Sequence, residues 1–409
     1  MTKEKKEKNS KKQRKRSAKV PAVILFTGVC LILIFLISGR LREMEEKNSV
    51  QPESSESKST EKDIAQSSET ASADPLTEQP QTLVLIPENL EIDEDDVQNT
   101  ETGGVTATVT ISAAGDCTLG TDENFDYSTS LPAKYEAVGD PSYFLANVKD
   151  IFASDDLTIV NLEGTLTNGG SRADKTFAFR GDPSYVEILT SGSVEACSLA
   201  NNHSKDYGIE SYQDTIANVE NAGIRTFGYD RTVLYETKGV KIGLTGIYEL
   251  AEGIGCREQM ETNVRTLKEQ GADLVIVSFH WGTEKENYPD EIQKELGHAA
   301  IDAGADLVLG HHPHVLQEIE KYQGKYIVYS LGNFCFGGNK NPSDKDTMIF
   351  QQTFTLTDGI AADDDQIRII PCRITSDPSF NNYQPTPAEG DEAERILGRI
   401  TQYSSAFET

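Results

Sequence analysis

The chain has 409 residues, enough for one large or two modest domains with additional segments. Its 66 Asp and Glu residues outnumber 38 Lys and Arg residues, which gives a formal net charge of −28. Such an acidic chain argues against nucleic acid as a partner, because phosphate backbones require Lys- and Arg-rich surfaces. The charge is unevenly spread: residues 1–19 are dominated by Lys and Arg, and nearly everything after Arg42 is acidic.

Residues 20–39 are uncharged and apolar, and their length suits one membrane-spanning helix. The basic tail 1–19 favours a cytoplasmic N-terminus and an extracellular C-terminal domain. A cleaved signal peptide is the alternative. The apolar run is longer than the usual signal-peptide core, and no clear A-x-A site follows it. We therefore expect an uncleaved, single-pass anchor in the cell membrane.

Residues 40–104 are rich in Ser, Glu, Thr, Gln and Asp. Such a composition cannot bury enough apolar surface to fold, so we predict a disordered acidic linker. Four apolar residues, 83–86, interrupt it and are a candidate to dock on the folded domain.

From residue 105 to residue 409 strand-like and helix-like segments alternate, which is typical of an α/β domain. The expected strands cover residues 105–116, 157–164, 194–203, 240–248, 272–282 and 305–314. Helical spacing occurs at 141–154, 211–223, before Gly271 and at 289–303. A hairpin is expected around Gln323 and Gly324, and the segment after Met348 is more purely strand-like.

Several of these strands end in side chains of the kinds that bind metals. They are Asp116, Glu163, Asn202, His203, His280, His312 and His314. Sites in open α/β sheets form beyond the carboxyl ends of strands, so these residues are expected to converge. Only six histidines occur in the chain, and five lie at expected strand ends: His203, His280, His311, His312 and His314.

Histidine and carboxylate ligands suit Mn, Fe or Zn ions. The absence of a cysteine cluster speaks against a structural zinc finger. The sequence therefore predicts a site for one or two divalent metal ions. A pair of ions bridged by a carboxylate is suited to phosphoryl displacement.

Six motifs make the pattern more specific: GDCTLG (115–120), NLEG (161–164), LANNHSKDYG (199–208), FHWGTE (279–284), GHHPHV (310–315) and YSLGNF (329–334). In this order they resemble the CapA, or poly-γ-glutamate capsule synthesis, family over about residues 108–336. That family is similar in fold to calcineurin-like metallophosphoesterases. The resemblance implies two packed β-sheets flanked by helices.

The resemblance also implies roles for individual residues. The implied metal ligands are Asp116, Glu163, Asn202, His280, His312 and His314, with Glu163 in the bridging position. His203 would donate a proton or stabilise the transition state, and Asp206 would orient it. The sequence departs from the phosphoesterase pattern at Thr118, where that pattern has His, and at Glu163, where it has Asp. The number of metal ions and the question of whether the site is catalytic therefore both stay open.

Other residues near the motifs have two interpretations each. Trp281 either stacks on a substrate or packs beside the site, and Asn333 either contacts the substrate or shapes a loop. The loop 168–180 either presents Arg172, Lys175 and Arg180 to an anionic ligand or is simply solvated. His311 either binds metal or supports a ligand. Asn201 is expected to be a strand-end residue, and His298 a hydrogen-bonded structural residue.

Three functions are compatible with these residues. The first is a membrane-anchored protein that helps to make or export an anionic capsule polymer, poly-γ-glutamate, with a hydrolase-type metal site. The second is a metal-dependent phosphoesterase that acts on a phosphorylated cell-envelope component. The third is a non-catalytic subunit of a membrane synthesis complex.

The five cysteines after residue 105 show no C-x-x-C spacing and are expected to be buried thiols.

Overall fold

The computed structural model describes residues 83–85, 106–362, 366–404 and 407. The basic tail, the apolar run 20–39 and most of the expected linker lie outside these residues. Among the helices of the described ranges, none has both the length and the apolar character needed to cross a membrane. The described residues belong to one compact unit, Leu76–Thr409.

The larger sheet is mixed. Its main strands run in the order β1 (Leu83–Leu85), β17 (Gln366–Arg373), β15 (Asp346–Thr357), β2 (Thr106–Thr118), β3 (Leu157–Leu162), β6 (Ala196–Ser198) and β7 (Arg225–Phe227). Strands β2, β3, β6 and β7 are parallel, whereas β15 and β17 are antiparallel to their neighbours. Three short strands join this sheet at its margins: β14 (Asn333–Phe336), β16 (Ile360–Ala361) and β18 (Thr386–Pro387).

The smaller sheet has the order β12 (Ile319–Tyr322), β13 (Lys325–Val328), β11 (Leu307–His311), β10 (Leu274–His280), β9 (Val240–Tyr248) and β8 (Thr232–Thr237). Its central strands β9, β10, β11 and β13 are parallel, so their carboxyl ends share one edge. A separate pair is formed by β4 (Thr165–Leu166) and β5 (Arg180–Gly181).

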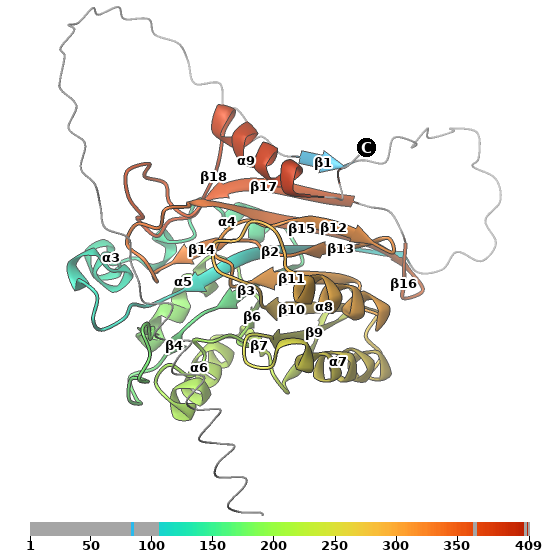
Figure 1. Ribbon diagram of the computed structural model, residues 1–409, viewed down its shortest axis with the longest axis horizontal. Helices are drawn as coiled ribbons and strands as arrows, with labels where there is room; N and C mark the ends of the chain where they lie inside the picture. The colour runs from blue at the N-terminus through green and yellow to red at the C-terminus, as the bar shows by residue number, and fades with distance from the viewer. Residues whose placement is uncertain (1–82, 86–105, 363–365, 405–406, 408–409) are drawn as a thin grey trace, which may run out of the picture. The chain divides into compact units, whose positions relative to one another are not determined.

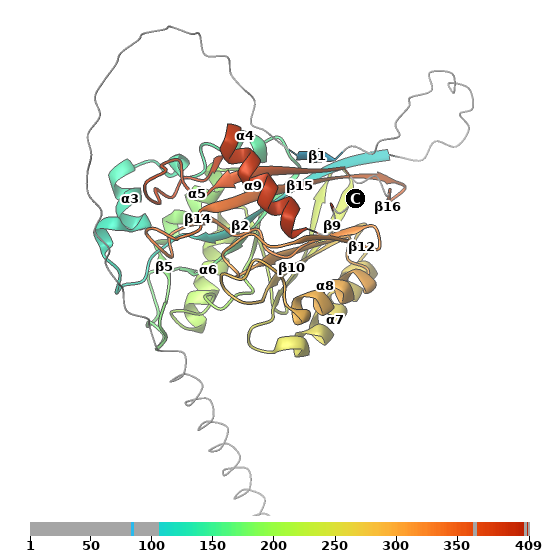
Figure 2. The ribbon, with the colours of Figure 1, turned by 45° about the horizontal axis from the view of Figure 1, so that its top comes forward.

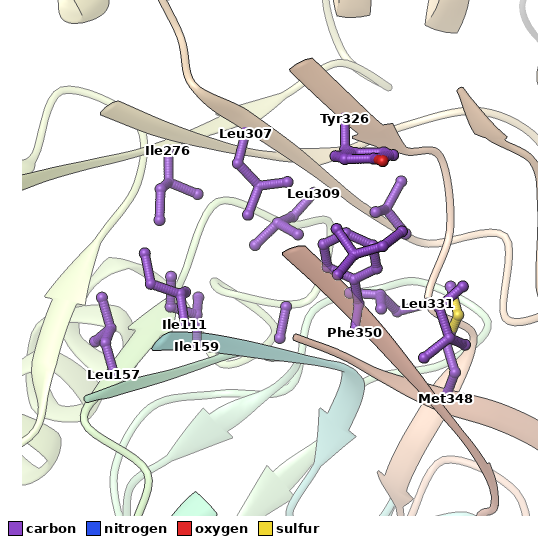
Figure 3. Packing of buried hydrophobic residues seen from close by; sticks show 14 of the residues in the cluster. Ile111, Leu157, Ile159, Ile276, Leu307, Leu309, Tyr326, Leu331, Met348 and Phe350 are labelled. Atoms are coloured by element: carbon purple, nitrogen blue, oxygen red, sulfur yellow. The ribbon is translucent and has the colours of Figure 1, made fainter. Parts of the chain in front are cut away.

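The two sheets pack face to face around one apolar layer. In β10, Leu274 and Ile276 belong to this layer, while Val275 and Val277 face the helices on the other side. Alternate side chains of a strand point to opposite faces, and because both faces are covered here every residue of β10 is buried. Figure 3 shows the inter-sheet layer, to which the sheets contribute Ile111, Leu157, Ile159, Ile276, Leu307 and Leu309.

Helices cover the outer faces of both sheets (Figures 1 and 2). The smaller sheet carries α7 (Arg257–Glu269) and α8 (Glu291–Asp302), and the larger carries α4 (Lys149–Phe152), α5 (Val186–Ser191) and α6 (Ile209–Asn221). Helix α9 (Gly390–Tyr403) packs on β17 and contributes Ile396 and Ile400 to the inter-sheet layer. The described domain is therefore mixed α/β, with sheets flanked by helices, as the sequence predicts.

The structure also corrects and extends the expected elements. The expected helix at 141–154 is broken into a 3-10 turn, η2 (Pro141–Tyr143), a stretch of turns and the single turn of α4. The expected strand at 194–203 is only β6, after which the chain turns away. Helices α3 (Leu131–Val138) and α9 were not predicted. The expected docking of the apolar patch is confirmed for Leu83–Leu85, which pairs with β17.

Two glycines let the segment 329–332, which joins β13 of the smaller sheet to β14 of the larger sheet, lie close against strand ends. A Cβ atom on Gly115 would lie 1.9 Å from the Gly332 carbonyl oxygen, and one on Gly310 would lie 2.0 Å from the Tyr329 carbonyl oxygen. Only glycine fits where backbones are this close. The approach lets Asp116 N–H donate to the Gly332 carbonyl at 2.9 Å. The loop that precedes β14 is thereby held against the end of β2.

The cysteine prediction is confirmed for the described residues. Cys117, Cys197, Cys256, Cys335 and Cys372 are all free and buried. Burial raises the pKa of the Cys117 and Cys256 thiols to about 12, so they are protonated and inert at neutral pH.

Candidate metal centre

The expected ligands meet where the carboxyl ends of the parallel strands converge. Asp116 lies near the end of β2, Glu163 follows β3, His280 ends β10 and His312 follows β11. Three groups of side chains hold possible ligand atoms within 4.8 Å of one another: Glu163–His280–His312, Asp116–Glu163–His314 and Glu284–His312–His314. Glu163 belongs to two of the groups, which is the property that a bridging carboxylate needs.

Unpartnered polar atoms test whether these residues fit a cation. Glu163 Oε1 and His312 Nδ1 are buried and have no hydrogen-bond partner among the described residues. Leaving such atoms unpaired costs about 1–3 kcal/mol each, and more for a charged group. A bound cation would satisfy them, and the mixture of imidazole and carboxylate donors suits Mn, Fe or Zn. The residues therefore fit a divalent ion.

Asp116 is fully buried and held by its neighbours. Its Oδ1 accepts from Asn161 Nδ2 at 2.8 Å, and its Oδ2 lies 3.1 Å from His314 Nδ1. Burial alone would raise the pKa of Asp116, but the imidazoles of His311 and His314 beside it hold that pKa well below its usual value. Asp116 is therefore a carboxylate, the form that binds metal.

The histidines of the centre differ in their protonation. Burial, reinforced by neighbouring His312, holds the pKa of His280 well below its usual value, and burial lowers the pKa of His312 to about 4. Both are therefore neutral imidazoles near pH 7, as metal ligands must be. Burial would also lower the pKa of His314, but the carboxylates of Glu163 and Asp116 raise it to about 9. His280 Nε2 lies 2.8 Å from Asn202 Oδ1, so the structure brings these two expected ligands into contact.

Asn161 is a residue of the centre to which sequence reasoning gave no role. Its Nδ2 donates to Asp116, and its Oδ1 accepts from Asn201 Nδ2 at 3.0 Å. Asn201 Oδ1 in turn accepts the backbone N–H of His203 at 3.1 Å. A chain of amides therefore joins the β2 carboxylate to the loop after β6. The signal in the sequence was the polar Asn161 inside an otherwise apolar strand.

Thr118 occupies the position at which the sequence departs from the phosphoesterase pattern. It cannot supply an imidazole, but its Oγ1 donates to Glu163 Oε2 at 3.1 Å. Thr118 and Glu163, the two positions at which the sequence departs from that pattern, are therefore in direct contact, and the threonine hydroxyl orients the glutamate. With Oε2 engaged by Thr118, Oε1 is left for another partner. Glu284, which sequence reasoning also left unassigned, belongs to one of the three groups and is exposed.

His203 and Asp206 lie in contact beside the cluster. His203 Nδ1 is 2.6 Å from Asp206 Oδ2, and Asp206 also accepts from Lys175 Nζ at 2.7 Å and from the Phe179 N–H at 2.6 Å. The Phe179 ring lies 4.5 Å from the imidazole, measured between ring centroids. These contacts fix one edge of His203, although its catalytic role stays a prediction.

Two expected substrate contacts are corrected. Trp281 is 0% exposed, stacks on Phe279 at 4.2 Å and donates through Nε1 to the Tyr329 carbonyl at 2.8 Å. The packing alternative therefore holds, because a ring enclosed on both faces cannot reach a substrate. Asn333 is also buried. Its Oδ1 lies 2.9 Å from His314 Nδ1 and its Nδ2 donates to the His314 carbonyl, so it supports His314.

The basic side chains of the loop 168–180 contact other parts of the protein, although much of the loop is exposed. Arg172 pairs with Asp122 at 2.7 Å, and Lys175 pairs with Asp206. Arg180 lies over the Tyr207 ring at 4.3 Å and is only partly buried, so its contact with an anionic ligand stays a prediction.

The two remaining histidines have different environments. His311 is buried and its Nδ1 lies 3.5 Å from Asp116 Oδ1, but it joins none of the three groups, which favours a supporting position. His298 bonds Glu320 at 2.8 Å and stacks on Tyr322 at 3.9 Å, which confirms its structural interpretation.

The fold and this cluster define the class: an α/β protein with sheets flanked by helices and a candidate divalent-metal centre at the strand ends. Comparison with known families is consistent with this class. Residues 110–338, more than half of the chain, match the family described as "Bacterial capsule synthesis protein PGA_cap". The chain belongs to this family, which confirms the resemblance seen in its motifs.

Curated relatives carry related names. The chain is 33% identical over 210 residues to the "PGA biosynthesis protein CapA" of Bacillus subtilis (strain 168), covering 46% of this chain and 55% of that protein. It is 34% identical over 187 residues to the "Capsule biosynthesis protein CapA" of Bacillus anthracis, covering 40% and 46%. The chain thus spans about half the length of these curated relatives. A crystal structure of a hypothetical protein from Thermus thermophilus is similar at a TM-score of 0.38 and 17% identity, over 64% of this chain and 98% of that one.

Proposed function

We propose that this protein takes part in making or exporting an anionic capsule polymer, poly-γ-glutamate, and that it does so through a divalent-metal centre of hydrolase type. Membership of the capsule synthesis family and the names of the relatives support the polymer. The observation that carries the metal centre is Glu163. This buried carboxylate has one unpartnered oxygen and belongs to two of the ligand groups.

The residues that would hold the ions are those of the three groups, with Asn202 beside His280. When bound, a divalent ion supplies Lewis-acid polarisation of the scissile group and of water. The protein's own side chains prepare the site for this. Thr118 and Asn161 orient Glu163 and Asp116, and the low pKa values of His280 and His312 keep those imidazoles neutral.

His203 is the residue that we propose exchanges a proton with the reacting group. Because its Nδ1 is engaged by Asp206, Nε2 is the nitrogen left for that exchange. Asp206 is itself held by Lys175 and by a backbone N–H, so it stays in place as the imidazole changes charge. Bonds to Asp206 thus fix the orientation of the general acid before substrate arrives, as efficient proton transfer requires.

We further propose that residues 20–39 anchor the chain in the cell membrane with the domain outside, where an exported polymer would be met. Subunits of a membrane synthesis complex would then be its partners. The finer fold assignment that we propose is the calcineurin-like metallophosphoesterase architecture. A phosphorylated envelope component is the second candidate substrate, favoured by the pairing of a shared carboxylate with imidazoles.

Metal content tests the centre directly. The purified full-length chain, Glu163→Gln and Thr118→Val are dialysed against Mn, Fe or Zn and measured by elemental analysis. Glu163→Gln keeps the shape of the side chain but removes its charge, so we expect it to lose the ion. Thr118→Val removes only the orienting hydroxyl, and we expect about tenfold weaker binding. The control is Glu258→Gln, at an exposed position on α7.

Activity then separates the candidate substrates. The loaded chain is offered γ-linked polyglutamate and a generic phosphodiester, each with the wild type and with His203→Gln. Cleavage of the polymer that His203→Gln abolishes supports the proposal, and cleavage of the phosphodiester alone supports the phosphoesterase. Equal metal content in the wild type and Glu163→Gln would contradict the metal centre.

A further inference from the structure

A groove runs away from the candidate centre along one side of the described domain. It consists of two hollows of about 400 and 470 Å³. Both are lined by Thr129, Ser130, Lys340 and Tyr383, so they are adjacent to each other. The walls come from the segment between β2 and α3, from α3 itself, from the loop between β4 and β5, and from the two loops that follow β14 and β17.

Aromatic rings connect the groove to the centre. Phe177 and Phe125 line the first hollow, and their rings lie 6.5 and 6.4 Å from that of Phe179, which packs on His203. The opposite wall is connected in the same way, because Phe336 lies 5.3 Å from the His314 ring. Gly338 follows Gly337, which lines the first hollow. A Cβ atom on Gly338 would lie within 3.2 Å of both the Phe336 and Phe179 rings. The first hollow therefore begins one aromatic layer from His203 and His314.

The groove combines apolar and cationic surface, which is unusual in a chain with a net charge of −28. Phe177 is 48% exposed, and Phe380 in the second hollow is 50% exposed. The ammonium of Lys340 serves both hollows, and Lys134 lines the second. The acid of the first hollow, Asp126, is engaged by Ser128, whose N–H and hydroxyl donate to it at 3.1 and 2.8 Å.

Amide side chains add donors and acceptors along the same path: Asn124, Asn339 and Asn341. Aromatic faces pack well against methylene groups, ammonium groups attract carboxylates, and side-chain amides bond to other amides. A ligand that offers all three in repetition is a polyamide chain with short aliphatic spacers and free carboxylates. A phosphate polymer would match the lysines and the amide donors but leave the exposed rings unused.

We infer that this groove is a binding site for an extended segment of a carboxylate-bearing polyamide, which it guides toward His203 and the metal centre. This inference rests on the proposed function, because it names how the polymer would reach the same site. Lys340 is the central residue, since it lines both hollows. Phe177 is the exposed ring of the first hollow that stacks on Phe179, the ring packed against His203.

Binding measurements on the full-length chain test the inference. The probe is a short fluorescein-labelled oligomer of γ-linked glutamate, followed by fluorescence anisotropy. We expect Lys340→Glu to weaken binding at least about tenfold, which corresponds to about 1.4 kcal/mol. Phe177→Ala is expected to weaken it about three- to tenfold through the lost ring face. The matched control is Lys241→Glu, which makes the same charge change at an exposed position where β9 begins, at the far end of that strand from the centre.

The outcomes separate the groove from the metal centre. If Lys340→Glu and Phe177→Ala bind the oligomer as the wild type does, the groove assignment is wrong, whatever the metal content. Inorganic polyphosphate of matched charge that binds as tightly as the oligomer would also overturn it. If the chain takes up no metal but both groove variants lose the oligomer and Lys241→Glu does not, the proposed centre fails and the groove stands.

Discussion

Glu195 offers a prediction whose size follows from the structure. It lies half-buried just before β6, where its Oε2 accepts the Thr158 N–H at 2.8 Å. Burial, reinforced by the carboxylate of Asp155, raises the pKa of Glu195 from 4.5 to about 7. Between these two pH values the unfolded chain gives up a proton that the folded chain keeps. The free energy of unfolding therefore falls as pH rises through this window.

Glu195→Gln removes the charge while keeping an oxygen that can accept from Thr158. For a fully buried group, the difference between 4.5 and about 7 would correspond to about 3.4 kcal/mol. Because the side chain is half-exposed, solvent screening reduces this to about 1 to 2 kcal/mol. We expect the variant to match the wild type near pH 4.5 and to be more stable by that amount above pH 7. The corresponding rise in Tm is about 2 to 6 °C.

The assay is thermal unfolding followed by circular dichroism at pH 5 and pH 8, with Glu394→Gln on the exposed face of α9 as the control. The difference in Tm between variant and wild type should grow with pH for Glu195→Gln and stay constant for the control. A Glu195→Gln difference that is the same at both pH values would refute the reasoning, and so would a variant that is less stable at pH 8.

Three further perturbations test the packing. Gly115→Ala places a Cβ atom 1.9 Å from a backbone carbonyl oxygen and should lower the free energy of unfolding in urea by about 3 kcal/mol or more. The control is Gly255→Ala, whose Cβ atom has its nearest neighbour 3.9 Å away and should change stability little. Trp281→Phe loses the hydrogen bond to the Tyr329 carbonyl and should lower the free energy of unfolding by about 1 to 3 kcal/mol without changing KM. A changed KM with unchanged stability would instead support a substrate contact for Trp281. Asp346→Asn weakens the ion pairs that two α9 arginines make with a buried carboxylate, so amide hydrogen exchange in α9 should accelerate, and unchanged exchange would contradict this role.

The sequence by itself determined the alternation of strands and helices and the identity of the central residues. Apolar runs and strand-end polar residues are local signals, so β9, β10 and β11 and the cluster around Asp116 and His280 could be predicted from them. The same locality explains the errors. The segment 141–154 has helical spacing, but it contains a proline-led 3-10 turn and only one turn of α-helix.

Only the tertiary structure decided which partners these residues have. The sequence left Trp281 open between a substrate contact and packing, and its ring lies against Phe279 and Tyr329. Asn161 had no assigned role, yet it holds Asp116. Both outcomes depend on contacts between residues far apart along the chain, as do the close approaches of Gly115 to Gly332 and of Gly310 to Tyr329. Spacing along one strand carries no information about such contacts, which is why the ligands were predictable and their supports were not.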